Sequence, residues 1–199
     1  MKKTIAILLF LIGSVFLFAE TGYRGFEWGT SEFLFELKAG ENDAVINLDP
    51  FKAKVYKTKL LGEERELYYI FYQEYFSAAF YIIPSEVTEK LLNNFDKKNR
   101  LAFIQTEKID FNYDEAIKQN IQNEDASTAK RQVDFIIGLQ TISFCAEIEK
   151  KADLTKAQNQ EAESQLIIYN YNNDTRVYIY KNMFDGKTIV VYYPHEQDY

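Results

Sequence analysis

Cysteine and histidine are almost missing from this chain of 199 residues, which contains one of each. Cys145 has no partner within the chain, so an intramolecular disulfide framework is excluded. His195 stands close to the C-terminus, whereas a catalytic triad or a histidine-rich metal site needs a rigidly held base or several ligands. We therefore expect no histidine-based catalysis and no metal site. We expect Cys145 to be a partly buried, inert thiol and His195 to be a surface tail residue.

Signatures of nucleotide and metal binding are also missing. The chain contains no Walker loop, no Gly-x-Gly-x-x-Gly run, no His-Glu-x-x-His motif and no calcium-loop pattern, and we expect no cofactor. Glycine and proline are scarce, with 8 and 3 residues, while aromatic residues make up 16% of the chain. This aromatic content fits a sugar-binding or peptide-binding surface, but also the compositional bias of an AT-rich genome. We use tyrosine mainly to locate strands.

The chain has fewer positively charged than negatively charged side chains. Two of its lysines, Lys2 and Lys3, precede an apolar run from Ile5 to Phe18. This pattern, followed by Ala19, predicts a signal peptide over residues 1–19 that is cleaved after Ala19, with a retained anchor as the alternative. The mature chain would carry 21 Lys and Arg against 30 Asp and Glu. Nucleic acid and anionic lipid are poor partners for such a surface.

Long apolar runs do not recur after the signal peptide, so we expect no integral membrane span after cleavage. Without a cysteine near the cut, a lipid anchor is not expected, and the localisation predicted is periplasmic or secreted. Residues 20–199 suit a single α+β domain that buries roughly 70% of the surface of its unfolded chain.

The stretch from Glu64 to Pro84 is the centre of the predicted fold. Two runs rich in aromatic and β-branched residues, Leu67 to Tyr72 and Phe76 to Ile83, flank the polar pair Gln73-Glu74. This predicts an antiparallel hairpin. Alternate side chains of the first run are apolar on both faces, so both faces of the hairpin need cover.

The segment before the hairpin predicts a helix and a strand. Phe26 and Trp28 share one side of an extended segment, and Thr30 or Ser31 can cap a short helix that ends at Ala39-Gly40. Trp28 is most simply a plug over the core. The breakers within residues 40–53 indicate a loop, and a strand follows over residues 54–61 to complete a three-stranded meander.

The segment after the hairpin is more varied. Ser85 predicts the start of a helix that runs towards Arg100 and covers one face of the meander. A strand over residues 101–109 and a short helix over residues 114–122 follow. The alternation over residues 133–148 indicates a strand with a bulge or bend between Gly138 and Thr141, although Val133, Ile137, Phe144 and Ile148 also fit a helix. Residues 150–165 are polar on every side and indicate a loop or loose helix.

Three strands are predicted at the C-terminal end, over residues 166–171, 176–183 and 187–193, with turns at residues 172–174 and at Asp185-Gly186. The tail beyond Pro194 is expected to fray. The predicted fold class is therefore α+β, with an antiparallel sheet built from two β-meanders and a few short covering helices.

Two short motifs carry a resemblance. Residues Arg24-Gly25-Phe26-Glu27-Trp28-Gly29-Thr30-Ser31 and the late run Asp174-Thr175-Arg176-Val177-Tyr178 resemble a group of uncharacterised exported bacterial proteins. That group shares an Arg-Gly-x-x-Trp-Gly-x-Ser opening and a terminal hairpin ending in Val-x-Tyr, here Val190-Val191-Tyr192. The resemblance implies export and no particular activity. A looser similarity is to small outer-membrane assembly modules, whose lipidation cysteine and Gly-x-Pro this chain lacks.

Two functional hypotheses follow. The first is an exported, non-catalytic binding or interaction module of the bacterial cell envelope that recognises a protein, peptide or glycan through aromatic side chains on one face of the sheet. Its candidate binding residues are Trp28, Tyr68, Tyr72, Tyr178 and Tyr180. The alternative is a hydrolase of a cell-wall or glycan substrate that uses two facing carboxylates, one with a raised pKa. Its candidates are Glu64, Glu66, Glu74, Glu147 and Glu149.

Overall fold

A computed structural model of the chain describes residues 22–105, 111–121, 125–151 and 165–195. In these residues the strands are β1 Ala44–Leu48, β2 Phe51–Leu60, β3 Glu63–Tyr72, β4 Tyr75–Pro84, β5 Arg100–Gln105, β6 Gln165–Asn170, β7 Thr175–Phe184 and β8 Lys187–Pro194. The helices are α2 Glu32–Ala39, α3 Thr88–Leu92, α4 Tyr113–Ile121 and α5 Ala126–Lys151, with 3-10 turns η1 Ser85–Val87 and η2 Lys97–Asn99. The α+β class is confirmed.

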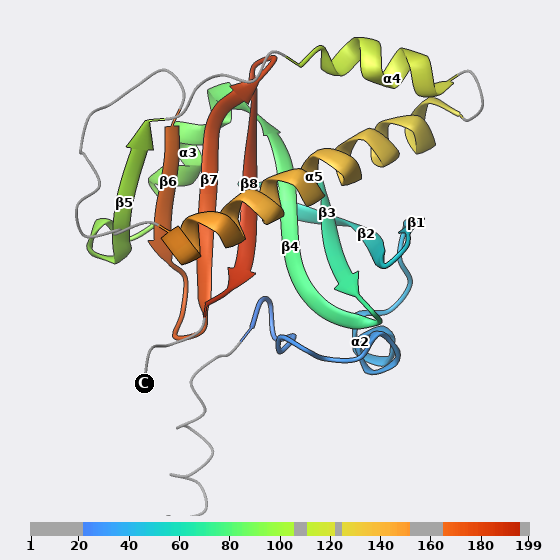
Figure 1. Ribbon diagram of the computed structural model, residues 1–199, viewed down its shortest axis with the longest axis horizontal. Helices are drawn as coiled ribbons and strands as arrows, with labels where there is room; N and C mark the ends of the chain where they lie inside the picture. The colour runs from blue at the N-terminus through green and yellow to red at the C-terminus, as the bar shows by residue number, and fades with distance from the viewer. Residues whose placement is uncertain (1–21, 106–110, 122–124, 152–164, 196–199) are drawn as a thin grey trace, which may run out of the picture.

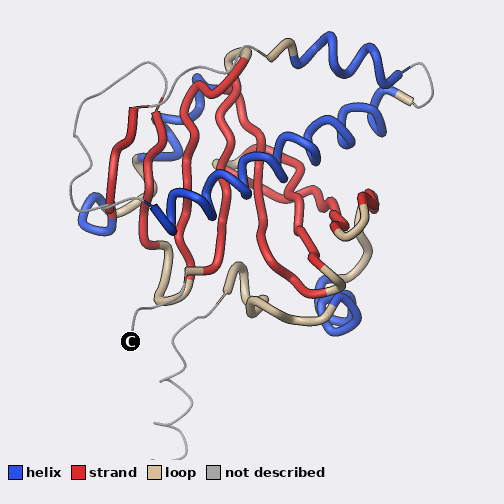
Figure 2. The backbone as a smooth tube through the Cα atoms, viewed as in Figure 1, coloured by secondary structure: helices blue, strands red, loops and turns tan. Residues whose placement is uncertain are grey.

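The eight strands form one antiparallel sheet in the order β1-β2-β3-β4-β8-β7-β6-β5. Strands β1 to β4 are neighbours in chain order, and so are strands β5 to β8. The two groups join where β4 pairs with β8, from Ala79 opposite Tyr192 to Pro84 opposite Lys187. The predicted pair of meanders is therefore correct, and the pairing of β4 with β8 makes them a single sheet. In Figure 2 the strands form one twisted layer, with α5 lying across it.

Both faces of the sheet are buried, as the apolar pattern of the hairpin predicts. On β3, Tyr68 and Ile70 belong to one core, and Leu67, Tyr69 and Phe71 belong to the other. The first core is covered by α4 and α5. The second is covered by the N-terminal segment with α2, and by η1, α3 and Phe95. A sheet covered on both faces explains why the strands do not alternate between apolar and polar residues.

The long helix α5 corrects the predicted strand over residues 133–148. Figure 1 shows α5 running diagonally across one face of the sheet. Gly138, at the bend that the sequence predicts in a strand, lies on this helix, where an added Cβ would stand 2.2 Å from two ring atoms of Phe80. The absence of a side chain at Gly138 therefore lets α5 approach β4 closely. Cys145, on the same helix, is buried.

Other predicted elements differ in extent. Residues 44–48, expected to be a loop, form the edge strand β1, and β2 begins at Phe51. The helix expected from Ser85 to Arg100 is reduced to η1 and the five residues of α3. The expected helices after Ser31 and over residues 114–122 correspond to α2 and α4. Residues 1–19, 106–109 and 152–164, which carry other predictions, lie outside the described residues.

The two motifs that carry the resemblance meet in space. The backbone N–H of Gly22 donates to both carboxylate oxygens of Asp174, at 2.9 and 3.0 Å. The indole N–H of Trp28 donates to the hydroxyl of Thr175 at 2.9 Å. Hydrogen bonds therefore hold the N-terminal segment against the start of β7, although about 150 residues separate them.

The last described residue is held rather than frayed. The backbone N–H of His195 donates to the carbonyl of Asp174 at 2.7 Å, and its ring nitrogen lies 2.9 Å from the guanidinium of Arg176. His195 is therefore a half-buried residue held beside the same corner, and residues 196–199 of the tail lie outside the described residues. None of the helices in the described ranges has the length and apolar character that crossing a membrane would require.

Candidate functional site

The predicted aromatic binding residues do not form one surface. Tyr68, Tyr178 and Tyr180 belong to the core beneath α5, with exposed fractions of 1%, 0% and 3%. Phe144 of α5 packs on the ring of Tyr180, with 5.6 Å between ring centroids. The prediction of a tyrosine-bearing recognition face is wrong for these three residues, because α5 covers the face on which they lie.

Trp28 and Tyr72 lie closer to solvent. The ring of Trp28 is half-buried and stacks on Phe76, with 4.6 Å between centroids. Together with its hydrogen bond to Thr175, this makes Trp28 a clamp across the end of the second core, in agreement with the expectation of a plug. Tyr72, at the end of β3, is 43% exposed and is the one residue of the predicted set with a large accessible surface.

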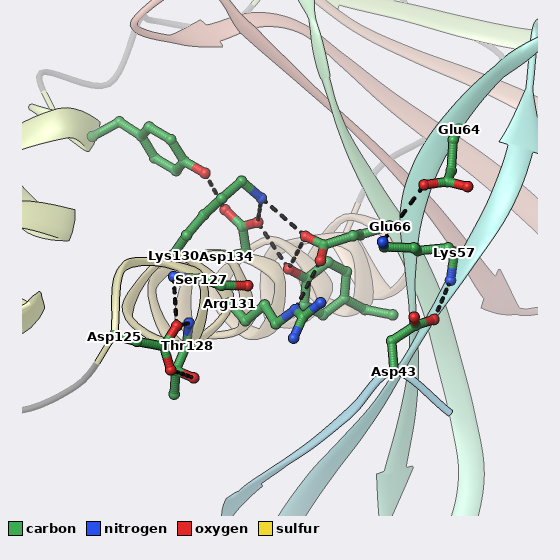
Figure 3. A network of polar contacts seen from close by, with 12 residues as sticks. Asp43, Lys57, Glu64, Glu66, Asp125, Ser127, Thr128, Lys130, Arg131 and Asp134 are labelled. Carbon is green, nitrogen blue, oxygen red and sulfur yellow. Dashed lines mark hydrogen bonds and ion pairs between the residues drawn. The ribbon is translucent and has the colours of Figure 1, made fainter. Parts of the chain in front are cut away.

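One predicted carboxylate, Glu66, lies in a polar network between the sheet and α5 (Figure 3). Its oxygens accept from Lys130 Nζ at 3.1 Å and from Arg131 Nε at 2.8 Å. Lys130 also contacts Asp134, with 2.5 Å between Nζ and Oδ2. The hydroxyl of Tyr68 donates to the same oxygen of Asp134 at 2.8 Å. Tyr113 of α4 donates to the other carboxylate oxygen.

Local structure brings these groups together. Glu66 and Tyr68 are two residues apart on β3 and therefore point to the same face of the sheet. Lys130 and Asp134 are four residues apart on α5 and lie on the same side of the helix. The network ties β3, α4 and α5 to one another, and it centres on Asp134, whose side chain is 1% exposed.

The electrostatics of the network favour the ionised form of Glu66 and the protonated forms of the two tyrosines. Burial raises the pKa of Glu66, but the hydrogen bond from Arg131 and the charge of Lys130 outweigh burial, and the net pKa of Glu66 is lowered. Burial, followed by the charge of Asp134, raises the pKa of the Tyr68 and Tyr113 hydroxyls. The tyrosines therefore stay protonated as donors, and Glu66 stays ionised as an acceptor.

A cavity of about 260 Å³ lies beside the network and is lined by Glu66, Asp134, Lys130 and also by Glu64 and Lys187. A glycosidase-type acid needs a carboxyl group whose pKa is raised, so that it holds a proton at neutral pH. Glu66 has the opposite shift because cations surround it. The geometry around Glu66 is therefore that of an anchor between elements, and it does not supply the acid of the carboxylate hydrolase.

The remaining predicted carboxylates are dispersed. Glu64 is exposed and lies 3.7 Å from Lys57 Nζ, and Glu74 is exposed in the turn between β3 and β4. Glu147 is exposed on α5, and the side chain of Glu149 lies outside the description. In the described part of the chain, no group of three or more His, Cys, Asp and Glu side chains has the geometry to hold a metal ion.

Sequence reasoning missed Asp134, Lys130, Arg131 and Tyr113. The signal was present in the spacing of Lys130 and Asp134, which is the spacing of an ion pair along a helix. The prediction of a strand over residues 133–148 obscured it, because that interpretation places Asp134 on a sheet face and begins the element after Lys130, so that the two residues do not share a helix.

A second feature is an exposed apolar surface at the end of the molecule where α2 lies, opposite α4 (Figure 1). On α2, Phe33, Leu34 and Leu37 are 68%, 56% and 70% exposed. The neighbouring turns add Leu48, Tyr72 and Tyr75, which are 47%, 43% and 57% exposed. We call these six residues the apolar end surface.

Backbone hydrogen bonds show that the three segments of the apolar end surface are neighbours. The N–H of Glu32 donates to the carbonyl of Glu74 at 2.7 Å, which joins α2 to the turn between β3 and β4. The N–H of Gln73 donates to the carbonyl of Pro50 at 3.1 Å, which joins that turn to the one between β1 and β2.

The orientation of α2 is set by buried charge. Lys54 of β2 is 1% exposed, and its ammonium lies 2.8 Å from Glu32 and also pairs with Glu36. A buried ammonium needs a carboxylate partner, so Glu32 and Glu36 must face the sheet. Phe35 fills the core between them and is 0% exposed. The apolar residues Phe33, Leu34 and Leu37 are consequently left facing solvent.

The chain was compared with models of protein families, with curated proteins and with solved structures, and none of the three comparisons found a match.

Proposed function

We propose that this protein is an exported, non-catalytic interaction module of the bacterial cell envelope, and that it binds a protein or peptide through the apolar end surface. The observation that carries the proposal is the orientation of α2, which exposes two-thirds of Phe33 and Leu37 to solvent. A contiguous apolar patch contributed by several segments is typical of an interaction site, whereas single exposed apolar residues are ordinary.

The charge around the patch points to the chemistry of the partner. Exposed Asp49 and Glu74 stand beside Leu48 and Tyr75, and the whole chain has a net charge of −7. The partner proposed is therefore a polypeptide segment with apolar side chains flanked by Lys or Arg. Complementary charge of this kind speeds association and selects among partners more than it adds affinity.

Peptide selection tests the binding part of the proposal. We expect that a library of 12-residue peptides, selected on the immobilised protein, yields sequences with apolar residues flanked by Lys or Arg. Affinities of the synthesised peptides, measured by isothermal titration calorimetry, should fall at least tenfold with the double variant Phe33→Gln/Leu37→Gln, because both side chains leave the interface. Glutamine is a good helix former, so α2 should persist.

The matched control is Ile136→Gln on α5. Ile136 is 46% exposed, so the variant makes the same apolar-to-polar change on a helix at a distant position. The proposal fails if the selected peptides bind the Phe33→Gln/Leu37→Gln variant as tightly as the unmodified chain. It also fails if sedimentation velocity shows a dimer that the double variant dissociates, since a second copy would then occupy the surface.

Export makes a separate prediction. The protein isolated from the envelope fraction of the producing bacterium should begin at Glu20, because the proposed signal peptidase cut follows Ala19. N-terminal sequencing and the intact mass would show this. A chain that still begins at Met1 in the soluble cytoplasmic fraction would contradict export without bearing on the apolar end surface.

A further inference from the structure

A cavity of about 420 Å³ lies on the face of the sheet opposite α5, between the N-terminal segment, the end of α2 and strands β2 and β3. Its lining includes Arg24, Lys38, Tyr56, Thr58 and Tyr69. No carboxylate lines it. Its cationic side chains are Arg24, Lys38 and Lys57, and in a chain with 30 acidic residues a cavity with three cations and no acid is unusual.

Arg24 is held at the cavity by a tight turn. The N–H and C=O groups of Tyr23 and Phe26 bond reciprocally at 2.9 and 3.1 Å, and Arg24 and Gly25 between them have φ of +51° and +79°. Positive φ at both central residues is the mark of a type I′ turn. The turn carries the guanidinium over the rings of Tyr23 and Tyr81, with 5.8 and 5.9 Å from Cζ to the two centroids.

Two of the three cations, Arg24 and Lys38, lack an acidic partner in the described part of the chain, whereas Lys57 Nζ lies 3.7 Å from a carboxylate oxygen of Glu64. Arg24 Nη2 lies 3.5 Å from the carbonyl of Lys59, which is at the limit of a hydrogen bond, and pairs with no described carboxylate. Lys38 donates to the carbonyl of Gly25 and lies 5.2 Å from the centroid of Phe26. The nearest carboxylate on α2, Glu36, is taken by Lys54.

Tyr69 adds a hydroxyl donor to the wall of the cavity. The residue is 5% exposed, lines the cavity, and its hydroxyl makes no hydrogen bond with the described residues. Burial raises its pKa, with smaller opposing and reinforcing effects from Arg24 and Tyr81, so the hydroxyl remains protonated. The hydroxyl of Thr58, also in the lining, bonds that of Tyr81 at 3.2 Å. The hydroxyl of Tyr69 is therefore available at the cavity as a donor to a ligand oxygen.

We propose that this cavity binds an organic oxyanion, a phosphate or carboxylate group on a small apolar body, with Arg24, Lys38 and Tyr69 as its ligands. Guanidinium, ammonium and phenol are all donors, and charge-assisted hydrogen bonds of this kind are the strong ones. Phe26 and Ala39 line the cavity with apolar surface for the rest of the molecule. The net negative charge of the chain is screened beyond about 10 Å, so the local cations dominate.

This site is independent of the apolar end surface. It also gives a role to the Arg-Gly pair of the N-terminal motif, because Gly25 allows the turn and Arg24 supplies the cation. A purely structural role for Arg24, as a lid on Tyr23 and Tyr81, would leave the binding of anions unchanged when the guanidinium is removed.

The test uses phenyl phosphate, benzoate and inorganic phosphate as probes, and neutral benzamide as a comparison. Titration calorimetry with the unmodified protein should give binding of phenyl phosphate or benzoate with a Kd of about 1 mM or below, weakened by added NaCl. The stronger of the two identifies phosphate or carboxylate as the natural group. Inorganic phosphate should bind more weakly, because it lacks the apolar body.

Two variants keep the fold while removing one donor each. Arg24→Asn leaves an Asn-Gly pair, which is the preferred sequence for a type I′ turn, and should weaken binding at least tenfold. Tyr69→Phe keeps the buried ring and should weaken binding several-fold. Two control variants should leave binding unchanged. Lys187→Gln removes a cation from the cavity beside Asp134, and Phe33→Gln/Leu37→Gln alters only the apolar end surface.

The proposal is overturned if Arg24→Asn binds phenyl phosphate and benzoate as well as the unmodified protein does, or if Lys187→Gln is the variant that loses binding. Equal binding of benzamide would show that the cavity selects for the ring and not for charge. Failure of every probe to bind at about 10 mM would also reject the site.

Discussion

Replacing Asp134 by alanine should lower the free energy of unfolding by about 3–5 kcal/mol, the range found when one partner of a buried charged network is removed. Asp134 is 1% exposed and accepts from Tyr68, Tyr113 and Lys130. Its loss leaves the buried hydroxyl of Tyr68 without its main acceptor and releases α4 and α5 from each other and from β3. Urea unfolding followed by far-ultraviolet circular dichroism measures the change.

The control for Asp134→Ala is Glu64→Ala. Glu64 is an exposed carboxylate near the same network, and its 3.7 Å contact with Lys57 is a surface ion pair worth at most about 1 kcal/mol. Asp134→Asn provides an intermediate, because the amide oxygen still accepts from a tyrosine while the charge opposite Lys130 is lost. Equal unfolding midpoints for Asp134→Ala and Glu64→Ala would show that the network does not hold the helices to the sheet.

Gly138→Ala is expected to destabilise the protein by about 1–3 kcal/mol, the usual cost of an overpacked core. In a free helix the same change would be stabilising by about 1 kcal/mol, so the two effects have opposite signs. The steric effect should dominate, because the added Cβ would stand 2.2 Å from the ring of Phe80. That ring is 0% exposed and stacks on Tyr68 with 4.6 Å between centroids, so it has no free space to enter.

Two further variants separate packing from helix propensity. Ser143→Ala makes a change to alanine at an exposed position of α5 and should be neutral or slightly stabilising. Phe80→Leu removes ring atoms near Gly138, so the double variant Gly138→Ala/Phe80→Leu should be less destabilised than the sum of the single changes. Additive losses, or a Gly138→Ala protein that is more stable than the unmodified chain, would contradict a close approach of α5 to β4.

The strands were predictable because their signal is local. Aromatic and β-branched runs interrupted by Gln73-Glu74 and Asp185-Gly186 define β3, β4, β7 and β8 with or without a partner strand. The apolar character of both faces of β3 also indicated a sheet with two covered faces. It was harder to predict which element covers the sheet. Within α5, apolar residues alternate as in a strand over residues 133–139, and they also recur at helical spacing over residues 133–148.

The candidate sites were less predictable, because the exposure of a side chain depends on which elements pack against it in the folded chain. Tyr68, Tyr178 and Tyr180 look like an aromatic recognition face until α5 is placed over them. Tyr72 stays accessible because it lies at the end of its strand. Lys54, which the sequence presents as one of several lysines on a strand, becomes a buried charge that sets the orientation of α2.

Composition and short-range pattern alone determined that this chain is acidic, has a single cysteine and a single histidine, and builds an antiparallel α+β body, since these properties depend on residue counts and on neighbours a few positions apart. Only the tertiary structure decided that β4 joins β8, that Asp134 ties α4 and α5 to the sheet, and that Arg24 stands over an acid-free cavity. Each of these depends on contacts between residues far apart in the chain, and no local periodicity encodes such contacts.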